Sequence, residues 1–307
     1  MRPRTGAGHL GHGFEARYLE AFAFFPALRW STQRFASSRA PVRLNEVHVL
    51  VAIGAFLFAQ WRTAVEGFAS QPLRVSGVAM IDDVLLEPEA EAELSEAAKR
   101  AVYDVIRLRR DVRHFQPDRE VSEVVLTRIL SAAHAAPSVG LSQPWGFLLV
   151  RSRVVRERIR ESFLRCRERE AALFSPERRA AYLAHRLEGI LEASLNVCVA
   201  VDLRPRSEPI LGTTAQPESL RASACCAVQN LWLAARAEGI GVGWVSIVEP
   251  EVLRTELALP AGVEPVAYLC VGHARAFRKR PMLEETRWSA RTPLESAVHA
   301  DGFWRDR

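Results

Sequence analysis

The chain has 307 residues, of which 49% are hydrophobic and 25% charged, a balance typical of a soluble globular protein with one large domain or two small ones. Its formal charge of +5 lies wholly in residues 1–79, which carry nine Arg, four Glu and neither Lys nor Asp. The remaining residues are neutral overall, which argues against a nucleic-acid partner for the folded part.

Residues 1–79 also differ from the rest in their pattern. Their apolar run Val49–Ala59 is shorter than the roughly 20 residues that a membrane span needs, so we expect no membrane partner. The Arg-rich, acid-poor composition is compatible with a transit peptide. We favour a start of translation at Met80, which would make residues 1–79 a disordered or non-native N-terminal extension and residues 80–307 the folded domain.

The first predicted helix leads into a cluster of arginines. Apolar residues recur with helical spacing over Leu94–Leu108, and Arg109–Arg113 follows with three guanidinium groups around the carboxylate of Asp111. Guanidinium groups bind phosphate oxygens in pairs, and a carboxylate held among them stays ionised and can act as a base. The alternative is a solvated charge cluster at a helix end, where cations complement the helix dipole.

A second helix and a loop precede the first predicted strand. Ser122 has the position of an N-cap for a helix that reaches Ala135 and stops before a proline. Residues Ala136–Trp145 are predicted to form a loop, either an ordinary connector or a segment that wraps a polar ligand. Its hydrogen-bonding side chains are Ser138, Ser142 and Gln143. A buried strand is predicted over Phe147–Arg151.

A charged helical hairpin occupies the middle of the chain. One helix is predicted over Val154–Phe174, and another from the N-cap Ser175 to about Leu191. The hairpin is too polar to be buried on all sides, so it is either a solvated surface or a lid, and we favour a lid around Leu173–Leu187. We interpret His185 as a surface residue rather than a ligand.

The last third of the chain alternates strands and helices. The most hydrophobic helix, Ser219–Glu238, is expected to be buried or at a subunit interface. Gly241–Gly243 is predicted to be a turn that lets backbone approach a planar ligand and feeds a strand ending at Ser246. The other predicted elements are strands Leu195–Val201 and Val263–Val271, the short helix Pro250–Leu257 and a basic tail containing Arg291.

The five cysteines show no spacing typical of a metal site or a disulfide framework. We therefore expect no metal ligands and a reducing, cytoplasmic location. Four of the cysteines are predicted to be buried as small hydrophobic residues. These four are Cys198, Cys225, Cys226 and Cys270.

Several motifs occur together in a recognisable order. They are Arg109–Arg113, Ala136–Gly140 with Gln143–Trp145, Cys226–Arg236 and Gly241–Ser246. On these residues the chain resembles the BluB branch, the 5,6-dimethylbenzimidazole synthases, of the flavin-dependent nitroreductase family. The resemblance covers about Leu94–Leu294 and does not reach residues 1–79.

The resemblance implies a fold and an activity. The fold would be α+β and nitroreductase-like, with a mixed central sheet flanked by helices, in a homodimer with sites at the subunit interface. Reduced FMN (FMNH2) would be consumed with O2, giving dimethylbenzimidazole, the lower ligand of cobalamin (vitamin B12), and a four-carbon sugar phosphate. NAD(P)H would enter indirectly, through a separate flavin reductase that supplies FMNH2.

The resemblance also implies which residues act. Asp111 would remove a proton from carbon, and Ser246 would hydrogen-bond the ring edge during flavin destruction. Positive charge near the phosphate and the reduced ring would stabilise both. The flavin-binding set would be Arg109, Arg110, Asp111, Val112, Arg113, Pro137, Ser138, Gly140, Gln143, Leu187, Gly243, Ser246 and Arg291.

The chain departs from that branch at one place and leaves two rival functions open. Members carry Met-Asp-x-Tyr-Ser where this chain has Ser219–Ser223, so Leu220 and Ala222 replace Asp and Tyr. Arg186 stands where some members have Lys. The rivals are an NAD(P)H-dependent nitroreductase or flavin reductase that keeps its flavin, and a degenerate, non-catalytic flavin-binding protein.

Overall fold

The computed structural model describes residues 93–302 of the chain. The chain divides into two units at Ser76 and Gly77, and all described residues belong to the second. The extension predicted over residues 1–79, with Met80, lies outside the described residues. Within residues 93–302 no helix is both long and apolar enough to span a membrane. The same range holds no cluster of His, Cys, Asp and Glu suited to a metal ion.

Four strands form one sheet at the centre of the fold. In sheet order they are β1 (Trp145–Val150), β2 (Leu195–Asp202), β4 (Val263–His273) and β3 (Ile240–Trp244). All neighbouring strands pair antiparallel. The α+β class is confirmed, but the mixed pairing that we expected is reduced to one isolated parallel bridge, between Asp111 and Val242. This pairing does not continue as a strand, and Phe115 instead forms an antiparallel bridge with Ala274, directly after β4.

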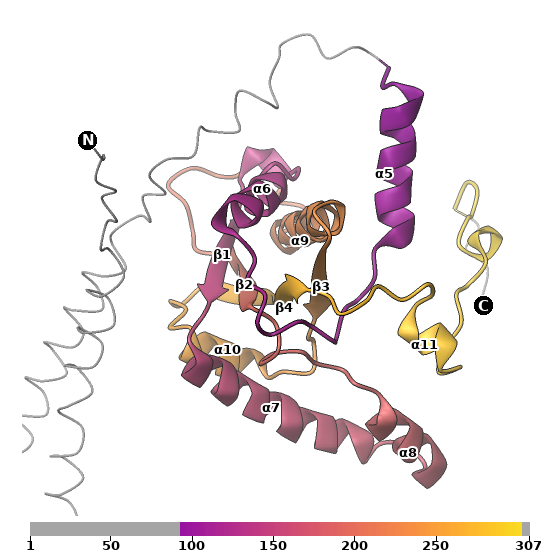
Figure 1. Cartoon of the computed structure of the whole chain (residues 1–307). Helices are drawn as coiled ribbons and strands as arrows, with labels where there is room; N and C mark the ends of the chain where they lie inside the picture. Colours follow the sequence, from indigo (N-terminus) through magenta and orange to yellow (C-terminus); the bar gives the residue numbers. More distant parts are fainter. Residues whose placement is uncertain (1–92, 303–307) are drawn as a thin grey trace, which may run out of the picture. The chain divides into compact units, whose positions relative to one another are not determined.

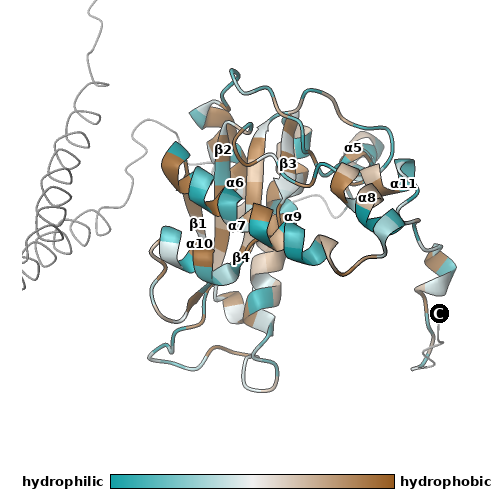
Figure 2. Ribbon diagram, turned by 90° about the horizontal axis from the view of Figure 1, so that it is seen from below, coloured by the Kyte–Doolittle hydropathy of each residue, from teal (hydrophilic) through white to brown (hydrophobic). Residues whose placement is uncertain are grey.

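Helices cover both faces of this sheet (Figure 1). Helices α6 (Glu123–His134) and α9 (Ser219–Ala237) lie on one face, and α7 (Arg153–Ala171) and α10 (Pro250–Glu256) lie on the other. Successive residues of a strand point to opposite faces, so β2 contributes to two cores. Val197, Val199 and Val201 pack with α9, whereas Cys198 packs on the α7 side. Figure 2 shows the apolar strands between helices with hydrophilic outer turns.

The predicted N-caps are confirmed, but one helix is shorter than predicted. Ser122 accepts a hydrogen bond from the Val125 N–H at the start of α6, and Ser175 caps α8 (Pro176–Ala184) in the same way. The prediction that this second hairpin helix reaches Leu191 was wrong. The helix ends at Ala184, where Arg167 of α7 donates to the carbonyl oxygens of Leu183 and His185.

Helix α5 (Glu96–Leu108) buries none of its residues within the described chain. Val102, Tyr103 and Ile106 are 51%, 70% and 49% exposed. Burying one large aliphatic side chain contributes about 1.5–3 kcal/mol, and the exposed apolar side of α5 has no packing partner among the described residues to supply this. Figure 1 shows α5 beside α9 at the edge of the fold.

Two cysteine predictions were right and two were wrong. Cys198 and Cys270 are buried, and burial raises the pKa of each thiol to about 12. Cys225 and Cys226 are exposed. They lie on α9 between the buried positions Ala224 and Ala227, so the helical period turns them away from the sheet.

The tail after β4 packs against the helical hairpin. It contains α11 (Met282–Glu285) and the 3₁₀ turn Leu294–Ser296. His185 is 8% exposed, lies 2.8 Å from the Thr286 hydroxyl through Nε2, and packs edge-on against Trp288. Our interpretation of His185 as a surface residue was therefore wrong, because a tail about 100 residues further along the chain covers it.

Candidate active site

The arginine cluster lies directly against β3. The Val112 N–H donates to the Val242 carbonyl oxygen over 2.9 Å, beside the bridge between Asp111 and Val242. A Cβ atom at Gly243 would stand 2.1 Å from the Val112 carbonyl oxygen, so the approach requires glycine. Two of the predicted motifs, far apart in sequence, are thus joined by backbone contact.

The Asp111 carboxylate is held by both of those motifs. One oxygen lies 2.5 Å from Arg113 Nη2, and the other accepts the Trp244 N–H over 3.0 Å. The side chain keeps 40% of its surface open, but protein atoms crowd the carboxyl on its other sides. This desolvation raises the pKa of Asp111, against the opposing effects of Arg113, the Trp244 N–H and Arg109. A carboxylate with a raised pKa is a stronger base.

Arg113 has hydrogen-bond donors left over. Its Nη2 also donates to the Trp244 carbonyl oxygen over 2.6 Å, and its side chain is 12% exposed. The buried Nε and Nη1 atoms have no partner within residues 93–302. Buried donors are nearly always paired in proteins, so these two atoms fit an anionic or carbonyl-bearing ligand placed beside Asp111.

The other arginines of the predicted site have distinct surroundings. Arg109 stacks its guanidinium 4.6 Å from the centre of the Trp232 ring, and burial lowers its pKa, with Arg110 and Arg291 acting in the same direction and Asp111 opposing. Arg110 donates to the carbonyl oxygens of Arg107, Arg109 and Lys279, which ties the end of α5 to the tail. Arg291 is 72% exposed and lies 3.1 Å from Glu284.

The residues around Ser246 differ slightly from the predicted turn and strand. Gly241 and Gly243 lie inside β3 rather than in a turn before it, because the strand must pass Val112 closely. Ser246 follows two residues after the strand and is exposed. Its hydroxyl makes no hydrogen bond within the described residues.

The predicted loop forms a separate group. Ser138 accepts the Gln143 N–H over 3.0 Å, and the Val139 N–H donates to the Ser223 hydroxyl of α9 over 3.1 Å. Gly140 has a positive φ of 54° and would place a Cβ 2.7 Å from the Leu211 carbonyl oxygen. Within residues 93–302 none of the loop's hydrogen bonds reaches the arginine cluster. Pro137, Gly140 and Gln143 are exposed.

Sequence reasoning missed two residues that order this region. Arg156 is 7% exposed and shares a face of α7 with Ile159 and Phe163, so an arginine in the apolar stripe was the available signal. Glu192 joins Arg186 to the Phe115 N–H and carried no sequence signal. Leu187, predicted to bind flavin, is partly buried against the core on the α7 side.

Comparison with known proteins defines the class to which this fold and site belong. The model of the nitroreductase family matches residues 106–273, more than half of the chain. The chain belongs to the nitroreductase family, and the nitroreductase-like fold that we expected is confirmed.

Individual relatives carry a more specific name than the family does. The chain is 43% identical over 185 residues to a protein of Rhodospirillum rubrum named 5,6-dimethylbenzimidazole synthase, covering 60% of this chain and 87% of the relative. It is 35% identical over 195 residues to a protein of that name from Rhodobacter capsulatus, covering 64% and 94%.

Among solved structures, the fold is similar to oxidised iodotyrosine deiodinase bound to FMN and 3-iodo-L-tyrosine. The TM-score is 0.52 at 21% identity, over 66% of this chain and 100% of the other. This likeness supports the fold alone.

Proposed function

We propose that the protein is a 5,6-dimethylbenzimidazole synthase, an oxidoreductase that fragments FMNH2 with O2 to give the lower ligand of cobalamin. The observation that carries the proposal is the Asp111 carboxylate, fixed by Arg113 and the Trp244 N–H and still open to a ligand. The two relatives of that name support the same reaction. Reduced flavin would supply both the electrons for O2 and the carbon skeleton of the product.

Cationic residues would hold the flavin. Arg113, whose buried Nε and Nη1 lack a partner within residues 93–302, would donate to the electron-rich pyrimidine end of the reduced ring, where positive charge stabilises developing negative charge. Arg109 and Arg291, which influence each other electrostatically, would hold the phosphate. Arg110 would act indirectly, because the structure commits its guanidinium to backbone carbonyls.

Asp111 would be the base. Removal of a proton from carbon requires a positioned carboxylate, and the two contacts of Asp111 hold it in one orientation. Desolvation raises the pKa of Asp111, which increases its basicity without closing its access to a ligand. Ser246, which is exposed and follows the end of β3, would donate from its hydroxyl to the edge of the ring.

The protein would work as a homodimer. The exposed apolar side chains of α5 have no packing partner among residues 93–302, and α9 also carries exposed small residues, Ala222, Cys225 and Cys226. No hydrogen bond among the described residues joins the loop around Ser138 to the arginine cluster, so a second copy would bring one chain's loop to the other's arginines. In a dimer of this kind, thiol reagents would label Cys225 and Cys226 only after dissociation.

The hairpin around Leu173–Leu187 would act as a lid over the ring, because exclusion of water protects a reactive reaction centre. A separate flavin reductase using NAD(P)H would supply FMNH2 in the cytoplasm. Residues 80–307 would hold all of this machinery, and residues 1–79 would be an extension outside it.

Two other functions compete with this proposal. A nitroreductase or flavin reductase would keep its flavin and turn over NAD(P)H. A non-catalytic flavin-binding protein is suggested by Leu220 and Ala222, which replace an Asp and a Tyr. Leu220 packs on the core that contains α9, and Ala222 is exposed. Both lie within one helical turn before Ser223, which holds the loop rather than Asp111.

The deciding experiment starts from chemically reduced FMN and no nicotinamide. The protein is mixed with this flavin under nitrogen, O2 is admitted, and the products are analysed by mass spectrometry. We expect dimethylbenzimidazole and an irreversible loss of flavin absorbance. Complete recovery of oxidised FMN would instead support a reductase or a binding protein.

A further inference from the structure

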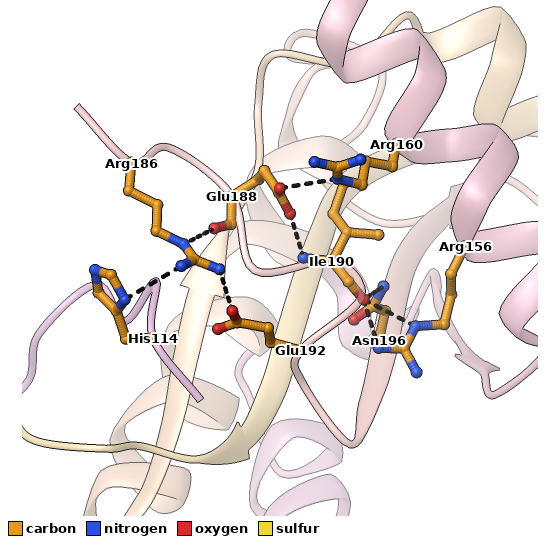
Figure 3. Close-up of polar contacts among 8 residues, drawn as sticks. All are labelled: His114, Arg156, Arg160, Arg186, Glu188, Ile190, Glu192 and Asn196. Atoms are coloured by element: carbon orange, nitrogen blue, oxygen red, sulfur yellow. Dashed lines mark hydrogen bonds and ion pairs between the residues drawn. The ribbon is translucent and has the colours of Figure 1, made fainter. Parts of the chain in front are cut away.

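The turn that leaves the helical hairpin is anchored by a buried arginine (Figure 3). Arg156 of α7 donates to the Ile190 carbonyl oxygen from Nε over 2.8 Å and from Nη2 over 2.5 Å, and it also donates to Ala193. Burial lowers the pKa of Arg156. Asn196 adds a bond to the same Ile190 oxygen over 3.1 Å. A cation fully used by backbone carbonyls fixes the conformation of this turn.

Glu188 fixes the other side of the turn. Its carboxylate accepts the Ile190 N–H over 2.7 Å and pairs with Arg160 of α7 over 3.0 Å. Gly189 lies against Phe115, where a Cβ would stand 2.5 Å from the Phe115 ring. Phe115 itself is 0% exposed. The turn and the segment that follows the arginine cluster therefore interlock without spare room.

Glu192 projects from this fixed turn toward Arg186 and the segment that follows the arginine cluster (Figure 3). Its carboxylate lies 2.6 Å from Arg186, at the exit of the proposed lid, and accepts the Phe115 N–H over 3.4 Å. Arg186 Nη1 in turn lies 3.4 Å from His114 Nδ1. Burial by itself would raise the pKa of Glu192. The ion pair with Arg186 and the hydrogen bond from the Phe115 N–H have the larger combined effect, so the pKa of Glu192 is lowered.

We infer that Glu192 is a positioning residue, which holds the Asp111–Arg113 segment and the lid exit in one fixed relation. Phe115 is two residues from Arg113, whose guanidinium orients Asp111, so a shift at Phe115 moves the reacting carboxylate. Small displacements of positioned groups reduce chemistry strongly while leaving binding nearly intact. The inference rests on the proposed function for its catalytic consequence, but its structural part is independent of that function.

The first test measures amide hydrogen exchange in the full chain and needs no activity. We expect Glu192→Ala to accelerate exchange in the peptide spanning residues 111–116 by about tenfold. Glu192→Gln keeps an oxygen acceptor for Phe115 and should show a smaller effect. The control is Glu157→Ala, which removes a surface ion pair of the same kind to Arg153 on α7 (2.8 Å). Equal exchange in Glu192→Ala, wild type and control would overturn the inference.

The second test separates chemistry from binding. With chemically reduced FMN and O2, we expect Glu192→Ala to lower the maximal rate of product formation by about tenfold and flavin affinity by less than about twofold. Glu192→Gln should recover part of the rate. Loss of affinity in step with rate would contradict the positioning role. Absence of product from the wild-type protein would refute the proposed function alone, and the exchange result would then decide this inference.

Discussion

The two groups of predicted flavin-binding residues differ in how much of their structure one chain supplies. The arginine cluster is fixed to β3 by backbone pairing and by two contacts to Asp111. The loop around Ser138 is held by α9 and lies close to the connector before that helix, and none of its hydrogen bonds within residues 93–302 reaches the arginine cluster. Under the proposed function, one chain would build the reacting half of the site, whereas the second half, around the loop, would depend on assembly with a second copy.

The largest expected effect comes from the reacting half. Asp111→Asn keeps the size of the side chain and an oxygen for the Trp244 N–H, but it removes the base and the charge facing Arg113. We expect product formation to fall about 10²–10⁴-fold with flavin binding retained. Mass spectrometry of dimethylbenzimidazole and a flavin titration measure the two quantities. Undiminished product would remove Asp111 from the mechanism.

The close approach of the cluster to β3 is the next target. Gly243→Ala would place a Cβ 2.1 Å from the Val112 carbonyl oxygen and force the segment away from the strand. We expect a loss of about 1–3 kcal/mol in the free energy of unfolding, together with weaker flavin binding. Thermal unfolding measures the first effect. Gly146→Ala in β1 is the matched control, because nothing lies within 4 Å of the added Cβ.

The proposed dimer contact, on which the second half of the site depends, is tested on α5. Ile106→Glu puts a charge on the apolar side that we assign to the dimer contact, where Ile106 is 49% exposed in one chain. We expect dimerisation to weaken by about 2 kcal/mol or more and flavin affinity to fall with it. Analytical ultracentrifugation measures the first. Val154→Glu, at a 54% exposed apolar residue of α7, should leave both unchanged; a dimer unaffected by Ile106→Glu would refute the contact.

The smallest effect is expected at the loop's anchor. Ser223→Ala removes the hydroxyl that accepts the Val139 N–H and should cost about 0.5–1.5 kcal/mol, seen as a modest loss of flavin affinity. Ser219→Ala is the control, because its hydroxyl donates to Gln216 on the exposed side and touches no loop residue. If the two variants bind flavin equally, the loop's anchor has no part in binding.

Local sequence patterns predicted most elements but not their tertiary partners. The N-caps Ser122 and Ser175 and the apolar strand β2 were evident because capping and hydrophobic runs are properties of neighbouring residues. The early end of α8 and the burial of His185 were not, because both depend on residues that lie elsewhere in the chain. The glycines of β3 were wrongly assigned to a turn. Their close contact with Val112, which requires glycine, involves a segment distant in sequence and leaves no local signal.

The sequence by itself determined the composition of the site: three arginines around Asp111, a polar loop, and a glycine-rich segment ending in a serine. It also determined, through the family's motifs, which fold would carry them. Only the tertiary structure decided that Asp111 accepts the Trp244 N–H, that Arg113 keeps donors without a partner among the described residues, and that Glu192 links Arg186 to Phe115. The physical reason is that hydrogen bonds and desolvation arise between residues that are distant in sequence, so no local pattern of residue types specifies them.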